Sequence, residues 1–226
     1  MTMARIAGID PGKQKDSFAF VGTEISQGKI NVLGARRWLG KAYLEVEESI
    51  AGIHERNPFK HYVVERNNVG EHVVEVLARN YKLPVVPVIT MKDIKSKEKR
   101  MSPSVMDKND MVKYMIIKKN EGNMTFPKEV GEIKELLRQL SIFAEIKSPQ
   151  TGNVRYQAEG AEHDDLVMAL MLACFIGRYY INRKSEHPGG YAVASKSFKA
   201  SFEEGDTLGS AIPYGTTPGQ RSVYYP

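Results

Sequence analysis

Cysteine is almost absent from this chain, since Cys174 is the only one among 226 residues. One cysteine excludes an intrachain disulfide framework and a cysteine-ligated zinc site, and it fits a reducing compartment. Cys174 lies inside the apolar run 166–176, where we expect a small core residue rather than a nucleophile.

Long hydrophobic runs and targeting signals are missing as well. The run 166–176 is too short to cross a bilayer and has Asp164, Asp165 and Arg178 close to its ends. Residues 1–6 show no signal-peptide pattern. The sequence therefore predicts a soluble intracellular protein with no membrane partner.

The chain also lacks the phosphate-binding segment G-x-x-x-x-G-K-[ST]. The Gly-Lys pair in Pro11-Gly12-Lys13-Gln14 does not belong to such a segment. ATPases of the actin and sugar-kinase type begin with Gly-Ile-Asp, as this chain does at Gly8-Ile9-Asp10. They need a second glycine-rich phosphate loop, which the sequence does not contain, so this alternative is disfavoured.

The chain does contain enough hydrophobic residues to form a core, and it has a slight excess of positive charge. Hydrophobic residues make up 42% of the chain, and 32 Lys and Arg against 27 Asp and Glu give a net charge of +5. This charge is compatible with a nucleic-acid partner, but it is common in other proteins too.

The first half of the chain predicts a mixed α/β sheet. Alternating or continuous apolar patterns predict strands, and apolar residues at helical spacing predict helices. The predicted strands are 4–10, 17–25, 30–38, 61–65 and 84–89, and the predicted helices are 43–55 and 69–79. Three meandering antiparallel strands followed by a parallel strand–helix–strand unit match the ribonuclease H-like topology, with helices on both faces. Strand 84–89 is expected to be of the fully buried kind.

The second half predicts more helices and a change of composition near the end. We expect helices at 104–120, 129–140 and 163–183, a turn with a short strand at 122–127, and a hairpin from 143–147 and 154–157. Gly, Ser, Pro, Thr and aromatic residues dominate from 185 onward. The sequence thus predicts one domain, 1–184, and a poorly ordered or partner-docking tail, 185–226.

Three acidic segments carry most of the functional information. Asp10 and Glu65 each end a predicted strand, and Asp164 and Asp165 precede the apolar helix. Each has an ordinary structural explanation when taken alone: a turn, an ion pair or a helix cap. All of them fall, however, where an α/β sheet presents side chains at one edge of its central strands, which is the usual place of a ligand site. We therefore expect them to converge.

Converging carboxylates predict a site for Mg²⁺ or Mn²⁺ and metal-assisted cleavage of a phosphodiester. In this hypothesis two ions clamp the phosphate, Asp10 bridges them, and Glu65 and Asp165 each complete one shell. Asp165 shares a helix face with apolar positions three, four and seven residues on, so it is preferred to Asp164 as the ligand. His163 is a candidate for proton transfer or phosphate contact, although a polar residue near a helix cap is an equally good interpretation.

These residues resemble the nuclease domain of the large terminase subunits of tailed bacteriophages. The resemblance lies in Gly-Ile-Asp-Pro-Gly at 8–12, Val-Val-Glu-Arg-Asn-Asn at 63–68 and His-Asp-Asp-Leu-Val-Met-Ala-Leu at 163–170. The Lys-Asn-Asp of 108–110 and the segment 122–127 extend it, so that it covers about 4–182.

The resemblance implies a ribonuclease H-like fold and an endonuclease that cuts concatemeric viral DNA with little sequence preference. It also implies that Asp10, Glu65 and one of Asp164 and Asp165 bind metal. The implied partners are double-stranded DNA, the portal protein and a packaging ATPase domain, and the implied location is the cytoplasm of the infected host cell.

Two departures from that family pattern stand out. The packaging ATPase is absent from this chain, so an isolated nuclease domain or a split gene product is expected. Met168 stands where related resolvases and some terminases carry another acid, so one metal is expected to bind more weakly.

Basic and amide residues supply candidate contacts to the DNA backbone, which give affinity without sequence readout. One group follows Glu65 directly, and the other forms a short basic cluster. The candidates are Arg66, Asn67, Asn68, Lys92, Lys95, Lys97, Lys99 and Arg100.

Two other functions remain open from the sequence. A Holliday-junction resolvase on the same fold would prefer four-way junctions to linear duplex. A non-catalytic DNA-gripping packaging module would bind DNA in a salt-dependent way and never cut it.

Overall fold

The computed structural model describes residues 3–12, 17–67, 69–91, 105–128, 131–147, 154–158 and 163–181. Within these ranges the strands form a seven-stranded sheet of order β6-β5-β4-β1-β2-β3-β7. Its strands are β1 Met3–Asp10, β2 Phe18–Ser26, β3 Lys29–Trp38, β4 His61–Glu65, β5 Val85–Met91, β6 Val105–Asp107 and β7 Met124–Thr125.

The sheet combines an antiparallel half with a parallel half around β1. β2 pairs antiparallel with both β1 and β3, which gives the predicted meander. On the other side β1, β4, β5 and β6 are parallel. β7 adds a short parallel pairing at the β3 edge, which the sequence did not predict.

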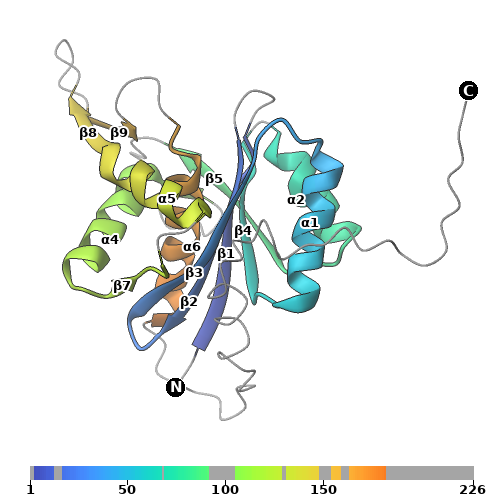
Figure 1. Cartoon of the computed structure of the whole chain (residues 1–226), viewed down its shortest axis with the longest axis horizontal. Coiled ribbons are helices and arrows are strands. Elements are labelled where there is room, and N and C mark those ends of the chain that lie inside the picture. Colours follow the sequence, from blue (N-terminus) through green and yellow to red (C-terminus); the bar gives the residue numbers. More distant parts are fainter. Residues whose placement is uncertain are drawn as a thin grey trace, which may run out of the picture.

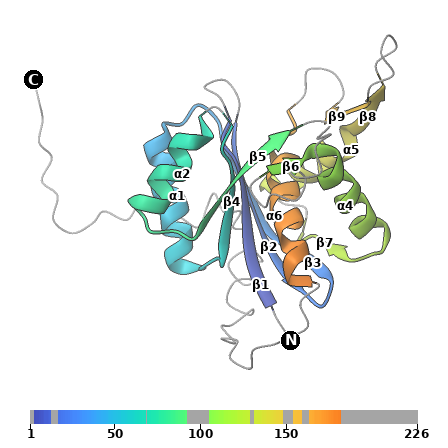
Figure 2. The same ribbon diagram turned by 180° about the vertical axis from the view of Figure 1, so that it is seen from behind.

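Helices cover both faces of the sheet, as Figures 1 and 2 show. One face carries α1 Tyr43–Arg56 and α2 Gly70–Arg79, and the other carries α4 Lys108–Asn120, α5 Gly131–Ile142 and α6 Asp165–Ile181. A separate hairpin of β8 Phe143–Lys147 and β9 Val154–Ala158 extends from the end of α5. Each face has its own apolar core.

Helix α6 packs directly on the centre of the sheet, running along β1 and β2. Every described side chain from Leu166 to Ile176 is buried, as its almost wholly apolar sequence predicts. Gly8 of β1 permits this close approach, because a Cβ there would overlap the backbone carbonyl oxygen of Ala169. At the far end of the helix, Gly177 likewise faces the Ile25 side chain.

Two sequence predictions about secondary structure are wrong in detail. The predicted helix 104–120 begins only at Lys108, because Asp107 is its N-cap and its carboxylate accepts a hydrogen bond from the Asn109 backbone N–H at 2.9 Å. Residues Val105–Asp107 instead form β6. The strand predicted at 84–89 forms, but only Val88 in β5 is buried.

Cys174 is a buried core residue, as predicted. Burial raises the pKa of its thiol to about 12, so it is an inert neutral group rather than a nucleophile. No helix in the described ranges combines the length and apolar character that a bilayer span requires. The tail 185–226, Asn68 and the basic cluster 92–100 lie outside the described residues, and the domain boundary at 184 stays a prediction.

Candidate active site

The register of the parallel strands places Asp10 beside Glu65. Ile9 of β1 is paired with Val64 of β4, so the next residue of each strand is an acid at the same carboxyl-end edge. Both acids also face the same side of the sheet. Side chains alternate along a strand, and Val63, two residues before Glu65, belongs to the core on the α6 face.

The first turn of α6 brings the other two acids to this edge. α6 runs antiparallel to β1, with Ala169 against Gly8 and Gly177 near Ile6. Asp165, four residues before Ala169, therefore arrives next to Asp10. Asp164 directly precedes the helix, and its backbone carbonyl accepts from the Met168 N–H at 2.9 Å.

The four carboxylates interact electrostatically. The pKa of Asp10 is raised well above its ordinary value, first by burial and then by the negative charges of Glu65 and Asp165. Asp164 contributes the weakest of these effects, and the Glu65 side chain is also hydrogen-bonded to Asp10. A carboxylate in this position is costly to ionise unless a cation offsets the repulsion.

Glu65 is held by two neighbours. Asn67 Nδ2 donates to Glu65 Oε1 at 2.9 Å and to the Thr90 carbonyl oxygen at 3.1 Å, and the Thr90 hydroxyl also donates to Glu65 Oε1. The carboxylate orientation is thus fixed from β5 and from the turn that follows β4.

The two aspartates at the start of α6 have different partners. The Ser17 hydroxyl, just ahead of β2, donates to Asp165 Oδ2. Asp164 Oδ2 lies 3.6 Å from Lys108 Nζ, at the start of α4. His163 is exposed at the rim, with Nδ1 3.9 Å from Asp165 Oδ2.

The chemistry of this donor set fits a hard divalent cation. All the candidate ligands are carboxylate oxygens, which Mg²⁺ and Mn²⁺ prefer, and the pKa of Asp10 is raised first by burial and then by the negative charges of Glu65 and Asp165. Within the described residues, no group of three or more His, Cys, Asp or Glu side chains stands in a geometry that could already hold an ion. The oxygens of Glu65 and Asp165 instead accept from hydroxyl groups, so an ion entering the site would compete with those contacts.

A family model for the RNase H-like domain of terminases matches residues 7–175, which include all four acids. The chain belongs to this terminase family.

Solved structures agree with this family. The large terminase nuclease of thermophilic phage G20c with bound magnesium is 22% identical, with 76% of this chain and 81% of that chain covered and a TM-score of 0.59. The large terminase nuclease domain of Thermus phage P74-26 is 19% identical, with 76% and 78% covered and a TM-score of 0.57. The predicted ribonuclease H-like fold is therefore confirmed.

The large terminase of another thermophilic bacteriophage has the same fold over part of its length. It is 14% identical, with 76% of this chain but only 39% of that chain covered, at a TM-score of 0.58. No curated protein sequence matches the chain significantly.

Among the described residues, the terminase domain brings the predicted acidic residues together. Asp10, Glu65, Asp164 and Asp165 converge, and His163 lies at the edge. Asn67 contacts Glu65 instead of projecting freely toward DNA. Arg66 Nε lies 2.7 Å from the Glu71 carboxylate, with Arg66 partly exposed and Glu71 exposed.

The sequence did not reveal several residues that contact the acids or the backbone next to them. Ser17, Thr90, Lys108 and Gln139 each come from a different element and are joined to the site only in three dimensions. Thr90 carried a weak signal, because it lies near the end of β5 at the same edge as Glu65.

Two further contacts support the strand ends. The Tyr43 hydroxyl of α1 donates to the Gly12 carbonyl oxygen at 2.8 Å, which ties down the chain just after Asp10. Gly70, the first residue of α2, packs against the Glu65 backbone so closely that a Cβ would overlap the carbonyl oxygen of Glu65. Both acids of the terminase site are thus anchored from the α1–α2 face as well.

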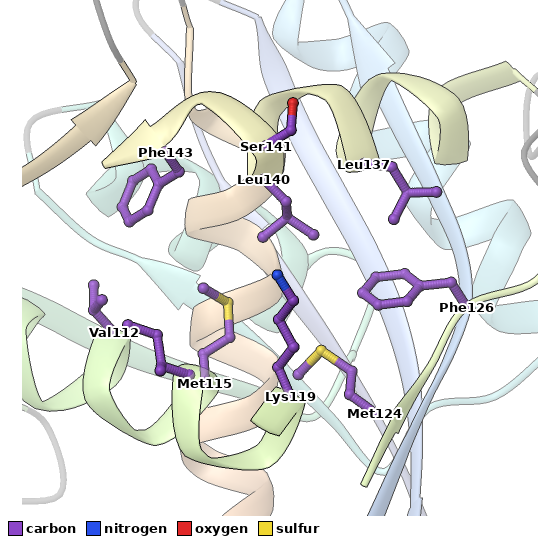
Figure 3. Close-up of a pocket in the computed structure, with 10 residues that line it drawn as sticks. Val112, Met115, Lys119, Met124, Phe126, Leu137, Leu140, Ser141 and Phe143 are labelled. Carbon is purple, nitrogen blue, oxygen red and sulfur yellow. The ribbon is translucent and has the colours of Figure 1, made fainter. Parts of the chain in front are cut away.

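A cavity of about 330 Å³ lies elsewhere on the α6 face, between α4, α5 and β7 (Figure 3). Its walls are mainly apolar, with the Lys119 amine pointing into the space, and it contains no carboxylate. It is therefore separate from the acidic site of the terminase domain. The lining residues are Val112, Met115, Ile116, Lys119, Met124, Phe126, Leu137, Leu140, Ser141 and Phe143.

Proposed function

We propose that this chain is a metal-dependent DNA endonuclease that cuts concatemeric viral DNA during phage genome packaging. The observation that carries the proposal is the convergence of four carboxylates at one edge of the sheet, where burial and then the charges of Glu65 and Asp165 raise the pKa of Asp10. Membership of the terminase RNase H-like family supports the same function and favours it over a junction resolvase.

The cofactors proposed are two Mg²⁺ or Mn²⁺ ions. Structures of the G20c terminase nuclease with bound magnesium and with bound cobalt support divalent metal use in this fold. When bound, such ions supply an activated water and stabilise charge on the attacking and leaving oxygens of the phosphodiester. The residues proposed to hold them are Asp10 as the shared ligand, with Glu65 and Asp165 as ligands of one ion each.

The remaining contacts orient these ligands. Asn67 and Thr90 fix the Glu65 carboxylate, and Ser17 fixes Asp165. Lys108 partly neutralises Asp164, which leaves Asp165 as the better ligand, in line with its larger effect on the pKa of Asp10. Such supporting partners typically alter metal affinity or activity by about 10- to 100-fold when removed.

The proposed partners are double-stranded DNA, the portal protein and a packaging ATPase domain, and the proposed place of action is the host cytoplasm. The net charge of +5 favours contact with the DNA backbone. His163 lies beside Asp165 at the rim, where it is proposed to contact phosphate or transfer a proton.

The first experiment is to incubate supercoiled plasmid with the protein in Mg²⁺, in Mn²⁺ and in EDTA. We expect nicking and linearisation that require the metal. DNA binding that is never followed by cleavage, in either metal, would support the gripping module instead. A strong preference for four-way junctions over linear duplex would support the resolvase.

We expect the two adjacent aspartates to differ in their contribution to cleavage. Asp165→Asn should lower the initial rate by about 1000-fold, the loss of a metal ligand, because several kcal/mol of transition-state stabilisation disappear. Asp164→Asn should lower it by only about 10- to 100-fold, as expected for a supporting group. Rates over a series of Mn²⁺ concentrations measure both effects, and the reverse order would assign the ligand to Asp164.

A further inference from the structure

Gln139 of α5 is a polar side chain with no exposed surface, and it joins α5 to the first turn of α6. Its Oε1 accepts a hydrogen bond from the Leu166 backbone N–H at 3.0 Å. Backbone N–H groups in the first turn of a helix have no partner within the helix. Gln139 therefore caps α6 from 27 residues away, directly after the acidic pair Asp164 and Asp165.

A second contact determines which end of the amide faces α6. Gln139 Nε2 donates to Glu135 Oε1 at 3.3 Å. An ionised carboxylate only accepts hydrogen bonds, so it selects the NH₂ end of the amide. Glu135 is itself held by Arg37 of β3 at 3.2 Å and by Arg138 at 2.8 Å. The Gln139 carbonyl is consequently turned toward Leu166.

This hydrogen bond acts on the α6 backbone, and it adds to the side-chain contacts of Asp165 with Ser17 and of Asp164 with Lys108. The described side chains that follow Leu166 in the helix are apolar up to Ile176, and apolar burial has no preferred direction. Apolar contacts hold the helix on the sheet without defining its rotation as sharply as a directed hydrogen bond does. A small rotation at this end would displace Asp165 from Asp10.

We propose that Gln139 is a positioning residue for the acidic site, which fixes the first turn of α6 and with it the carboxylates of Asp164 and Asp165. The inference rests on the proposed function and adds to it a residue that touches neither metal nor DNA. It also extends the site to β3, through Arg37 and Glu135.

The test compares Gln139→Met, which keeps the size of the side chain and removes both hydrogen bonds, with Ser141→Ala on the exposed side of the same helix. Mn²⁺ binding without DNA is measured by calorimetry, the fold by thermal unfolding, and the cap by hydrogen exchange at the Leu166 amide. In Gln139→Met we expect about 10- to 100-fold weaker Mn²⁺ binding, the usual loss for a supporting partner of a metal ligand, and a faster-exchanging Leu166 amide. Ser141→Ala should match the wild type in both.

Gln139→Glu serves as the conservative variant and covers the case in which Gln139→Met does not fold. A protonated carboxyl has the same two hydrogen-bonding ends as the amide, and burial beside Glu135 favours the protonated form. The Mn²⁺ affinity of this variant relative to wild type should therefore rise as the pH is lowered from about 8 to about 6. A role in packing alone would give a constant ratio.

The possible outcomes separate the inference from the proposed function. Wild-type Mn²⁺ affinity and Leu166 exchange in Gln139→Met overturn the inference. A folded wild type that binds no Mn²⁺ overturns the proposed function and the positioning role that rests on it. Both are supported if Gln139→Met binds Mn²⁺ more weakly and its Leu166 amide exchanges faster, and if Gln139→Glu recovers part of the Mn²⁺ affinity at low pH.

Discussion

Replacing Asp10 with asparagine is expected to abolish plasmid cleavage and to stabilise the metal-free protein. The change Asp10→Asn keeps the size of the side chain and removes one acidic group from a cluster of four. Loss of the proposed shared metal ligand should lower the cleavage rate by at least about 1000-fold. Stability should rise because an ionisable group is no longer buried there and Glu65 and Asp165 no longer repel an ionised neighbour.

The gain in stability depends on pH in a direction that follows from the pKa. Burial and the charges of Glu65 and Asp165 raise the pKa of Asp10 in the folded state above its unfolded value. The folded state then binds the proton more tightly, so the free energy of unfolding falls as pH rises from the unfolded pKa through the folded pKa. The stability advantage of Asp10→Asn over wild type should grow across that range and level off above it.

Urea unfolding in EDTA at several pH values measures this advantage, and plasmid cleavage in Mn²⁺ measures the activity. Glu48→Gln, an exposed acid-to-amide change on α1, is the matched control and should leave both unchanged. If Asp10→Asn is less stable than wild type at neutral pH, the four carboxylates do not repel one another as described. Retained cleavage in a pure sample would remove Asp10 from the metal site.

The change Gly8→Ala should destabilise the whole domain more than most surface or core substitutions. The added Cβ would overlap the Ala169 carbonyl oxygen and lie 2.9 Å from the Ala173 backbone nitrogen. Backbone atoms of a buried helix cannot rotate away as a side chain can, so α6 must lift from β1. We expect a loss of about 3 kcal/mol in the free energy of unfolding, at the upper end of the usual cost of overpacking.

Movement of α6 should also affect the site, since this helix carries Asp165. Any Gly8→Ala protein that still folds should therefore bind Mn²⁺ more weakly than wild type. Denaturant unfolding and calorimetry measure the two effects separately.

Gly52→Ala provides the matched control for Gly8→Ala. Gly52 lies inside α1, and a Cβ there would meet only Arg56 Nη1, at an ordinary 3.8 Å. Alanine in a helix interior is favoured over glycine by about 0.5–1 kcal/mol, so this variant should be slightly more stable than wild type. The prediction fails if the free energy of unfolding falls less in Gly8→Ala than it rises in Gly52→Ala. The packing of α6 would then not depend on its close approach to Gly8.

Local sequence patterns predicted most secondary structure correctly because each pattern reports burial within one element. The meander of β1 to β3 and the helix α6 are examples, since alternation and an all-apolar run are visible without knowing the partner. β6 was missed because three residues are too few to show a period, and the capping residue Asp107 lies inside the segment predicted as helix. The low burial of β5 was missed because burial depends on what packs against the faces of the strand in the folded chain.

The acidic site also has features that the sequence predicted and features that it did not. Asp10 and Glu65 were predictable, because an acid at the end of an apolar strand is conspicuous and parallel strands end at one edge of a sheet. The partners of these acids were not, since Ser17, Thr90 and Lys108 are ordinary surface residue types in the sequence. Gln139 gave no signal at all, because a glutamine in an amphipathic helix is usually exposed.

The sequence by itself therefore determined the fold class, the family and the acidic residues that the structure brings together. These depend on residue type and on order along the chain, which a linear pattern records. Only the tertiary structure decided how the carboxylates are held and which element sets the position of α6. A hydrogen bond such as that between Gln139 and Leu166 depends on distance and direction between elements far apart in sequence, and no local pattern carries that information.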